Sequence, residues 1–125
     1  MIVRRKLVKD LTAAQYHTLL DLTMGPSRGL MHGRLRYSRR NAPEDVIFYV
    51  TKNRKVVGWA LMFKIGPYKR DLYMFVHKEY RRKGVGTAIL KHVLAHKGRL
   101  DIRVYPWSKT SDAFYAPYKG KFIGI

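Results

Sequence analysis

The apolar residues of this chain follow two different periods, and each period predicts a different kind of element. Five segments rich in β-branched and aromatic residues have the composition of strands, and they cover residues 2–8, 46–52, 56–65, 71–77 and 100–105. Two segments repeat apolar residues every three or four positions, which predicts helices over residues 12–24 and from Val85 to about Lys97. Thr12 and Gln15 have capping-box spacing at the start of the first helix. A last helix, roughly 109–116, ends before Pro117. We therefore expect one α/β domain over residues 1–125.

The order of these elements predicts a mixed sheet. The three strands between residues 46 and 77 have short polar connections, which is typical of an antiparallel meander. A helix separates the third of these strands from the strand at 100–105, so these two should pair in parallel through a right-handed crossover. The last five residues, "KFIGI", have the composition of a strand remnant.

The connection between the first helix and the meander has no clear period. Residues 25–41, "GPSRGLMHGRLRYSRRN", contain three glycines, one proline, five arginines and no acidic residue. Two interpretations remain open, namely a short helix near residues 28–37 or a loop that becomes ordered only on binding.

Charge adds a class of partner to this picture. The chain has 26 Lys and Arg against 8 Asp and Glu, a net charge of +18, which favours nucleic acid, a phosphorylated cofactor or an acidic protein surface. No apolar run approaches the ~18 residues of a membrane span and the N-terminus lacks a secretion signal, so we expect a cytoplasmic protein without a membrane partner. The chain has no cysteine, which excludes disulfides and thiolate catalysis. His92 and His96 share a helix face, but Val93 replaces the glutamate of the zinc-protease motif, and no metal is expected.

The stretch "EYRRKGVGTAI", residues 79–89, combines three cations and two glycines at the start of a predicted helix. Such a turn presents unpaired N–H groups and the positive end of the helix dipole, which favours an anion. Glycine at positions 84 and 86 removes Cβ atoms that would obstruct a pyrophosphate. The spacing excludes a Walker loop. The dinucleotide fingerprint would need Gly or Ala in place of Ile89, although Asp101 lies at a tolerable distance for its ribose carboxylate.

A third interpretation accounts for the loop and its context together. The stretch "VHKEYRRKGVGTAIL" resembles the coenzyme A loop of the GCN5-related N-acetyltransferase (GNAT) superfamily, in which Arg or Gln is followed by two residues, Gly, one residue and Gly or Ala. The order of the predicted elements resembles the same family. The resemblance implies a mixed, mainly antiparallel sheet flanked by helices, with a truncated C-terminal hairpin, and it implies acetyl-CoA as the cosubstrate.

The resemblance also implies roles around the loop. The main chain of Phe75 and Val76 would run beside the pantetheine arm, and the amides from Arg82 to Thr87 would hold the pyrophosphate with electrostatic help from the neighbouring cations. The implied cofactor-binding residues are Phe75, Val76, Arg81, Arg82, Lys83, Gly84, Val85, Gly86 and Thr87.

The stretch "SKTSDAFYAPYKGKF" resembles the last motif of the family, in which an aromatic-Tyr pair precedes Gly-Phe. By this resemblance Tyr115 would place its hydroxyl against the leaving thiolate as the catalytic acid. Gly120 follows one residue later than the motif requires, so Tyr118 remains the alternative.

A base for the acceptor amine is harder to find. A lysine acceptor has a pKa near ~10.4 in water and must lose a proton before it attacks. Many family members carry a glutamate on the strand before the loop, whereas "LYMFV" at residues 72–76 has no acid. Glu79 belongs to the loop entry, and the remaining carboxylates cannot be ranked from sequence; they include Glu44, Asp45, Asp71 and Asp112. A water relay or an acceptor that arrives neutral is therefore the interpretation we favour.

The acceptor side should include the basic connection after the first helix, because this region shapes acceptor binding in the family. The candidate acceptor-binding residues are Arg34, Arg36, Arg39 and Arg40. They favour a lysine or N-terminus of a protein with an acidic or nucleic-acid-associated surface. The chain stops soon after the last helix, so either the site is open to a large acceptor or a partner subunit, as in a dimer, completes it. The alternative is a GNAT-fold module with weak or lost catalysis that binds nucleic acid or a transcription complex through "RLRYSRR" and "KNRK".

Overall fold

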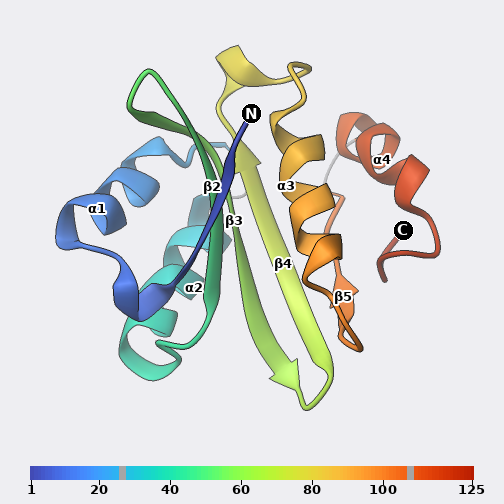
Figure 1. Ribbon diagram of the computed structural model, residues 1–125, viewed down its shortest axis with the longest axis horizontal. Helices are drawn as coiled ribbons and strands as arrows, with labels where there is room; N and C mark the ends of the chain where they lie inside the picture. Colours follow the sequence, from blue (N-terminus) through green and yellow to red (C-terminus); the bar gives the residue numbers. More distant parts are fainter. Residues whose placement is uncertain (26–27, 107–108) are drawn as a thin grey trace.

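A computed structural model describes residues 1–25, 28–106 and 109–125, and its centre is a five-stranded sheet in the order β1-β2-β3-β4-β5 (Figure 1). The strands are β1 (Val3–Leu7), β2 (Val46–Lys52), β3 (Lys55–Gly66), β4 (Lys69–Val76) and β5 (Asp101–Arg103). The α-helices are α1 (Ala13–Leu22), α2 (Arg28–Asn41), α3 (Val85–Ala95) and α4 (Lys109–Tyr115). The predicted mixed α/β fold is confirmed.

The strands pair as the sequence predicts. The strands from β1 to β4 are antiparallel to their neighbours, and β4 pairs with β5 in parallel. The β2–β3 hairpin turns through Asn53 and Arg54, whose φ angles of 51° and 64° are the positive values that two-residue hairpin turns require. The ladder between β4 and β5 is short, and its last residue pair is Asp71 and Arg103. Beyond that pair β4 continues to Val76 without β5 beside it.

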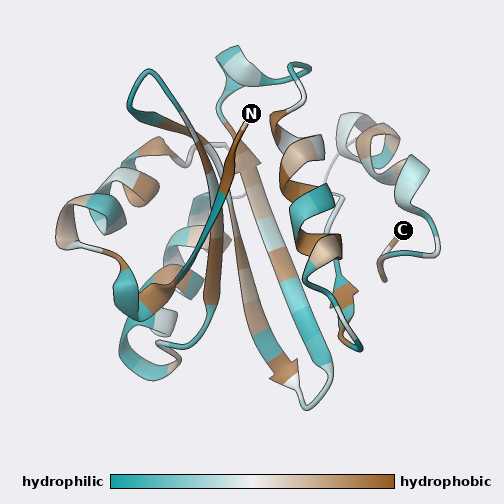
Figure 2. Ribbon diagram, in the orientation of Figure 1, coloured by the Kyte–Doolittle hydropathy of each residue, from teal (hydrophilic) through white to brown (hydrophobic). Residues whose placement is uncertain are grey.

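Helices cover both faces of the sheet and make two cores. On one face α1 and α2 pack against a layer that includes Trp59, Leu61 and Phe63. On the other face α3 packs with Ile89 and further apolar residues, and the segment from α4 to the C-terminus extends this core. Figure 2 shows apolar residues along the strands and a mixture of apolar and polar residues along the helices.

Local signals in the sequence explain where the helices begin. Thr12 caps α1 as predicted: its side-chain oxygen accepts a hydrogen bond from the Gln15 amide at 3.1 Å, and the Gln15 side chain accepts one from the Thr12 amide at 3.0 Å. The uncertain connection contains a helix, since α2 runs for 14 residues and is longer than the short helix that was one of the two interpretations. Helix α1 ends at Leu22, so Met24 lies outside it and is exposed.

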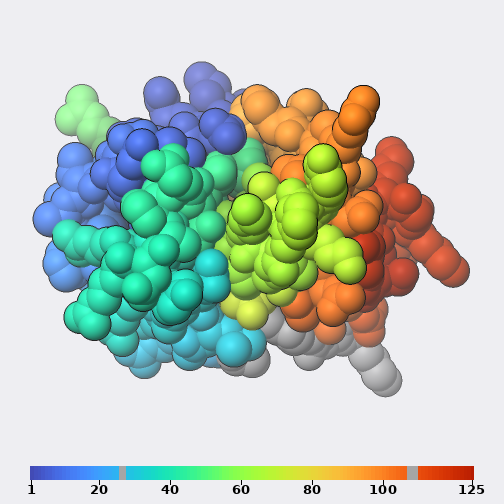
Figure 3. Space-filling view, turned by 90° about the horizontal axis from the view of Figure 1, so that it is seen from below, coloured from blue at the N-terminus to red at the C-terminus, as the bar shows by residue number. Residues whose placement is uncertain are grey.

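The C-terminal part is less regular than the sequence predicted. β5 has three residues instead of the six expected, and the predicted remnant at 121–125 makes isolated bridges, one of them between Ile123 and Arg103. Seen from below, the β3–β4 turn lies between the C-terminal end of α2 and the β5 region (Figure 3). Within the described residues, no helix is both long enough and apolar enough to cross a bilayer.

Candidate functional site

The loop between β4 and α3 presents main-chain N–H groups at the start of a helix. After β4 the chain forms a short 3-10 turn (Lys78–Tyr80), and Gly84 precedes α3 with a left-handed φ of 83°. Among the described residues no side chain caps the first turn of α3, so its N–H groups keep their capacity to bind an anion. A Cβ built on Gly84 would meet no atom within 4 Å, which shows that the space above this turn is open.

Three cations surround this turn, and all of them are exposed. The Arg81 Nε donates a hydrogen bond to the Val76 carbonyl at 3.0 Å, and its guanidinium lies 5.7 Å from the centre of the Phe75 ring. The Lys83 ammonium lies 5.6 Å from the centre of the Tyr80 ring. Within the part of the chain that the structure describes, none of the three cations forms an ion pair. Their positive field is therefore available to a ligand, while Arg81 also fixes the loop to the end of β4.

Gly86 has a different role from the one its sequence context indicated. A Cβ at this position would lie 2.9 Å from Cζ of Phe114 and 3.6 Å from Cε of Met74. Real Cβ atoms do not approach this closely, so the glycine allows the Phe114 ring of α4 to rest on the first turn of α3. This contact places the helix that carries Tyr115 directly beside the loop.

Tyr115 belongs to the core on the α3 side of the sheet and is 5% exposed. Burial raises the pKa of its hydroxyl above the ordinary value of tyrosine, so the group keeps its proton at neutral pH. The ring lies 4.9 Å from Phe114, centre to centre. Tyr118 is less buried and lies 6.4 Å from the same ring. Both tyrosines named by sequence thus lie in one aromatic cluster, and Tyr115 is the one enclosed by the core.

A buried acid lies on β4, where sequence reasoning did not rank one. Asp71 is 8% exposed, and its Oδ2 accepts a hydrogen bond of 2.5 Å from the Tyr105 hydroxyl. Its other oxygen, Oδ1, is buried and has no hydrogen-bond partner among the described residues. Burial, together with the hydrogen bond to Asp71, raises the pKa of Tyr105 to about 12. The two residues are 34 positions apart, so only the parallel crossover brings them together.

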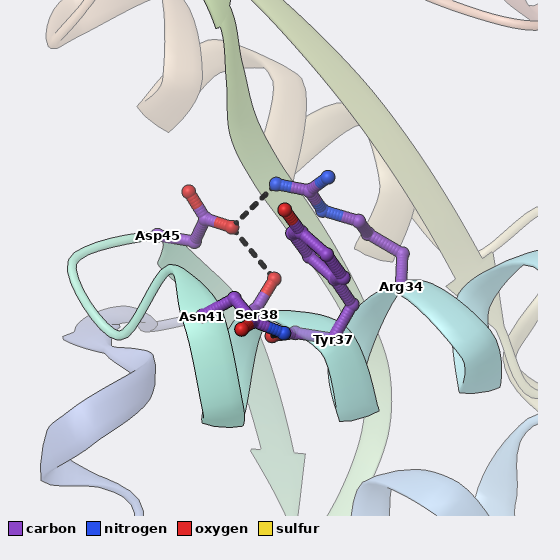
Figure 4. Close-up of polar contacts among 5 residues, drawn as sticks. All are labelled: Arg34, Tyr37, Ser38, Asn41 and Asp45. Atoms are coloured by element: carbon purple, nitrogen blue, oxygen red, sulfur yellow. Dashed lines mark hydrogen bonds and ion pairs between the residues drawn. The ribbon is translucent and has the colours of Figure 1, made fainter.

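The candidate arginines of α2 fall into two groups. Arg34 is mostly buried: its Nη2 donates to Oδ2 of Asp45 at 3.0 Å, and Ser38 donates to the same oxygen at 2.6 Å (Figure 4). The guanidinium also lies 4.1 Å from the centre of the Phe63 ring and 4.7 Å from that of Tyr37. Arg34 is therefore held in place as a link between α2 and the sheet.

The other three arginines are exposed and line an open groove between α1 and α2, which we term the α1–α2 groove. Its volume is about 1160 Å³, and its ionised lining consists of one acid, Asp21, and four arginines, Arg28, Arg36, Arg39 and Arg40. Arg39 lies over the Tyr16 ring at 4.2 Å. His32 also lines the groove, and its buried Nε2 has no partner in the described structure. The groove thus has a strong excess of positive charge.

No three His, Asp or Glu side chains of the described residues are close enough to hold a metal ion. The features that remain are a helix start with uncapped N–H groups, a buried tyrosine on the neighbouring helix α4, and a carboxylate at the point where β4 and β5 stop pairing, which we term the split.

Comparison with known proteins identifies this combination. Residues 43–118 match the family model described as "Acetyltransferase (GNAT) domain". This chain is a member of the GNAT family. The matched region runs from the start of β2 to the end of the tyrosine cluster, so it contains the loop, α3, Asp71 and Tyr115. No curated protein matches the sequence.

Solved structures confirm the fold of this GNAT protein. The ribosomal-protein-S18-alanine N-acetyltransferase from Escherichia coli aligns with a TM-score of 0.65 and 16% identity over 96% of this chain and 76% of that one. An N-acetyltransferase from Staphylococcus aureus Mu50 gives 0.62 and 16% over 95% and 83%. An aminoglycoside acetyltransferase from an uncultured soil metagenomic sample gives 0.62 and 17% over 95% and 85%. These identities show a shared fold, and the acceptors named for the Escherichia coli and metagenomic proteins differ from each other.

Membership of the family implies acetyl-CoA as the cosubstrate of this GNAT protein. The described residues fit that ligand, since the open turn at Gly84 and the unpaired cations supply what a pyrophosphate requires.

Proposed function

We propose that this GNAT protein transfers the acetyl group of acetyl-CoA to an amine, namely a lysine or N-terminus of a cytoplasmic protein whose surface is acidic or associated with nucleic acid. The observation that carries the proposal is the contact between Gly86 and Phe114, because it joins the anion-binding turn to the helix of the buried Tyr115. The contact supports a site in which the turn would hold the pyrophosphate and Tyr115 would be the nearby proton donor, an arrangement that thioester cleavage requires.

In this proposal the main-chain amides from Arg82 to Thr87 bind the pyrophosphate, and Lys83 and Arg81 add positive charge. The pantetheine arm runs along the main chain of Phe75 and Val76, at the end of β4 where β5 is no longer paired. The thioester then lies in the split between the two strands, with Tyr115 on the α3 side.

The chemical step forms a C–N bond and breaks a C–S bond. The neutral amine attacks the thioester carbon, and the thiolate of coenzyme A leaves with a proton from the Tyr115 hydroxyl. The proton lost from the new amide nitrogen returns to the tyrosine oxygen. The raised pKa keeps the Tyr115 hydroxyl protonated at neutral pH. Because it also makes a free phenolate costly, the amide proton must reach the tyrosine oxygen as the thiolate takes the hydroxyl proton.

The acceptor side in this proposal is the surface formed by α2. Arg36, Arg39 and Arg40 attract the acidic surroundings of the target amine. Arg34, the fourth candidate, contributes by holding α2 against β3 rather than by reaching outward.

The decisive experiment uses isotopically labelled acetyl-CoA. We expect acetyl-CoA to raise the melting temperature of the protein in a saturable way, because a ligand that binds only the folded state stabilises it. Incubation with a cell lysate should then place label on lysines or N-termini of acidic or nucleic-acid-bound proteins, read by mass spectrometry. Cofactor binding without any labelled protein would contradict the transfer.

A second candidate function is a binding module without catalysis. The α1–α2 groove favours it, since a cationic groove with aromatic side chains nearby is typical of single-stranded nucleic-acid binding. Steeply salt-dependent RNA or DNA binding, with no thermal shift on addition of acetyl-CoA, would support the module.

A further inference from the structure

The hydrogen-bonded pair of Asp71 and Tyr105 contains a buried carboxylate that uses only part of its acceptor capacity among the described residues. A buried carboxylate normally uses its acceptor capacity, because an unsatisfied buried polar atom costs about 1–3 kcal/mol. Here the Tyr105 hydroxyl donates to Oδ2 at 2.5 Å, while Oδ1 is buried and has no partner among the described residues. Asp71 also takes no part in an ion pair within that described region. One carboxylate oxygen is therefore ready to receive a proton or a donor.

The pair lies at the base of the split between the two parallel strands. Asp71 and Arg103 are the last residues that β4 and β5 pair, and Tyr105 lies two positions beyond. Side chains alternate along a strand, so Asp71 shares its face with Tyr73 and Phe75, which pack with the α1 and α2 core. Tyr115 belongs to the opposite core, with α3. Tyr115 and the Asp71–Tyr105 pair therefore lie on opposite faces of the sheet, and the pair is on the α1 and α2 side.

The surroundings of the pair are aromatic and well fixed. The Tyr73 ring makes edge-on contacts with Tyr105 at 5.3 Å and with Phe63 at 5.0 Å, centre to centre. The charged and titratable groups that act on the two tyrosines include Arg34 from α2, Arg103 from β5 and Asp71, and Tyr73 also acts on Tyr105. Rings can hold an ammonium ion on their faces, and the carboxylate supplies the negative charge.

We propose that Tyr105 receives the proton of the incoming ammonium ion and passes its own hydroxyl proton to Asp71. This inference rests on the proposed acetyl transfer and adds to it the group that makes the amine nucleophilic. The ammonium N–H bond breaks as the Tyr105 oxygen takes that proton, and the Tyr105 O–H bond breaks as Oδ2 of Asp71 takes the other. The products are a neutral amine, a neutral tyrosine and a protonated Asp71, which later releases its proton to water.

The transfer through Tyr105 avoids an ionised tyrosine. Its pKa of about 12 makes a free phenolate costly at neutral pH, so the hydroxyl works as a relay only because the carboxylate lies 2.5 Å away. Asp71 thus acts through Tyr105 and does not contact the amine.

The experiment compares two acceptors that differ in basicity. One is a glutamate-rich peptide with a blocked N-terminus and a single lysine; the other carries para-aminophenylalanine in place of lysine, whose aromatic amine is already neutral at pH 7. For the lysine peptide we expect Asp71→Asn and Tyr105→Phe each to lower kcat/KM by roughly 10²-fold, the range of acid-base catalysis. For the aromatic amine the loss should be much smaller, and the KM for acetyl-CoA should not change.

The pH profile gives a second readout that a structural role would not move. In Asp71→Asn the rate with the lysine peptide should follow the fraction of neutral lysine, rising about tenfold per pH unit below the lysine pKa of ~10.4. The control is Asp45→Asn, which removes another buried carboxylate on the same side of the sheet and should keep the shape of the wild-type profile. If Asp71→Asn fails to fold, Tyr105→Phe still tests the relay because it removes only the hydroxyl.

Equal losses for both amines, or no loss, would overturn the relay while leaving acetyl transfer intact. No transfer by the wild-type protein to either peptide, although acetyl-CoA binds, would instead overturn the proposed function and the relay that rests on it.

Discussion

The two faces of the sheet differ in the number of buried polar residues that they carry. The core on the α3 side is apolar apart from the hydroxyl of Tyr115. The side that carries α1 and α2 holds the buried polar residues of the described structure, which are Thr23, His32, Ser38, Asp45 and Asp71. Buried polar groups cost stability unless they are paired, so their gathering on one face indicates a use. The contrast fits the proposed function, in which the α3 side holds the cofactor by packing and the side of α1 and α2 supplies polar groups for positioning and proton transfer.

The largest effect should come from the cofactor face. Gly84→Glu should abolish acetyl-CoA binding, because it puts a carboxylate where we propose that the pyrophosphate binds, with no clash since a Cβ there meets no atom of the described residues within 4 Å. Isothermal titration calorimetry measures the loss. Gly84→Asn is the matched control, since Asn tolerates a left-handed φ and carries no charge. Unchanged affinity in Gly84→Glu would remove the loop from the site.

On the face that carries α1 and α2, variants of Arg34 and Arg36 should distinguish a structural role from a binding role. Arg34→Gln breaks a mostly buried ion pair with Asp45 and should lower the free energy of unfolding by about 3 kcal/mol. Arg36→Gln, at an exposed position on the same helix, should stay within about 0.5 kcal/mol and weaken polyanion binding instead. Urea unfolding and a salt titration of RNA binding give the two readouts. Similar stability losses in both variants would contradict the distinction between the two arginines.

Tyr115→Phe should then slow transfer by roughly 10²-fold at unchanged KM for acetyl-CoA, because it removes only the proton donated to the leaving thiolate. Steady-state kinetics measure this with any amine that the wild-type protein accepts. Tyr118→Phe is the control and should have little effect. If the two results were exchanged, Tyr118 would be the acid.

The smallest effect should come from the contact between Gly86, at the start of α3, and Phe114 of α4. Gly86→Ala should cost about 1 kcal/mol in the free energy of unfolding, because its Cβ would lie 2.9 Å from Phe114. The cost should shrink in a Phe114→Leu background, as urea denaturation of the single and double variants would show. If the losses in unfolding free energy of the two single variants simply added in the double variant, the glycine at position 86 would not serve the contact with Phe114.

The sequence predicts the sheet well because strand composition and short turns are local signals. The meander, the parallel crossover and the Thr12 cap are confirmed. Helix α2 was ambiguous because arginines interrupt its apolar face, although Met31 and Leu35 are fully buried at helical spacing.

The candidate site likewise has a part that can be predicted from the sequence and a part that cannot. The loop is contiguous in sequence, so its glycines and cations can be found by inspection. The partner of Gly86 is 28 residues away, and that of Asp71 is 34 residues away. Such contacts depend on the crossover, and no spacing rule within one segment predicts them. The roles proposed for Tyr115 and the α2 arginines stay predictions until the variants are measured.

The three-residue ladder between β4 and β5 has a mechanical consequence. The segment from β5 to the C-terminus is fastened to the meander by little main-chain pairing, so we expect its amides to exchange hydrogen through partial opening while β1 to β4 remain closed. Tyr105 and Tyr115, the two groups that handle protons in the proposed reaction, both lie on that segment and are held by side-chain contacts more than by main-chain pairing.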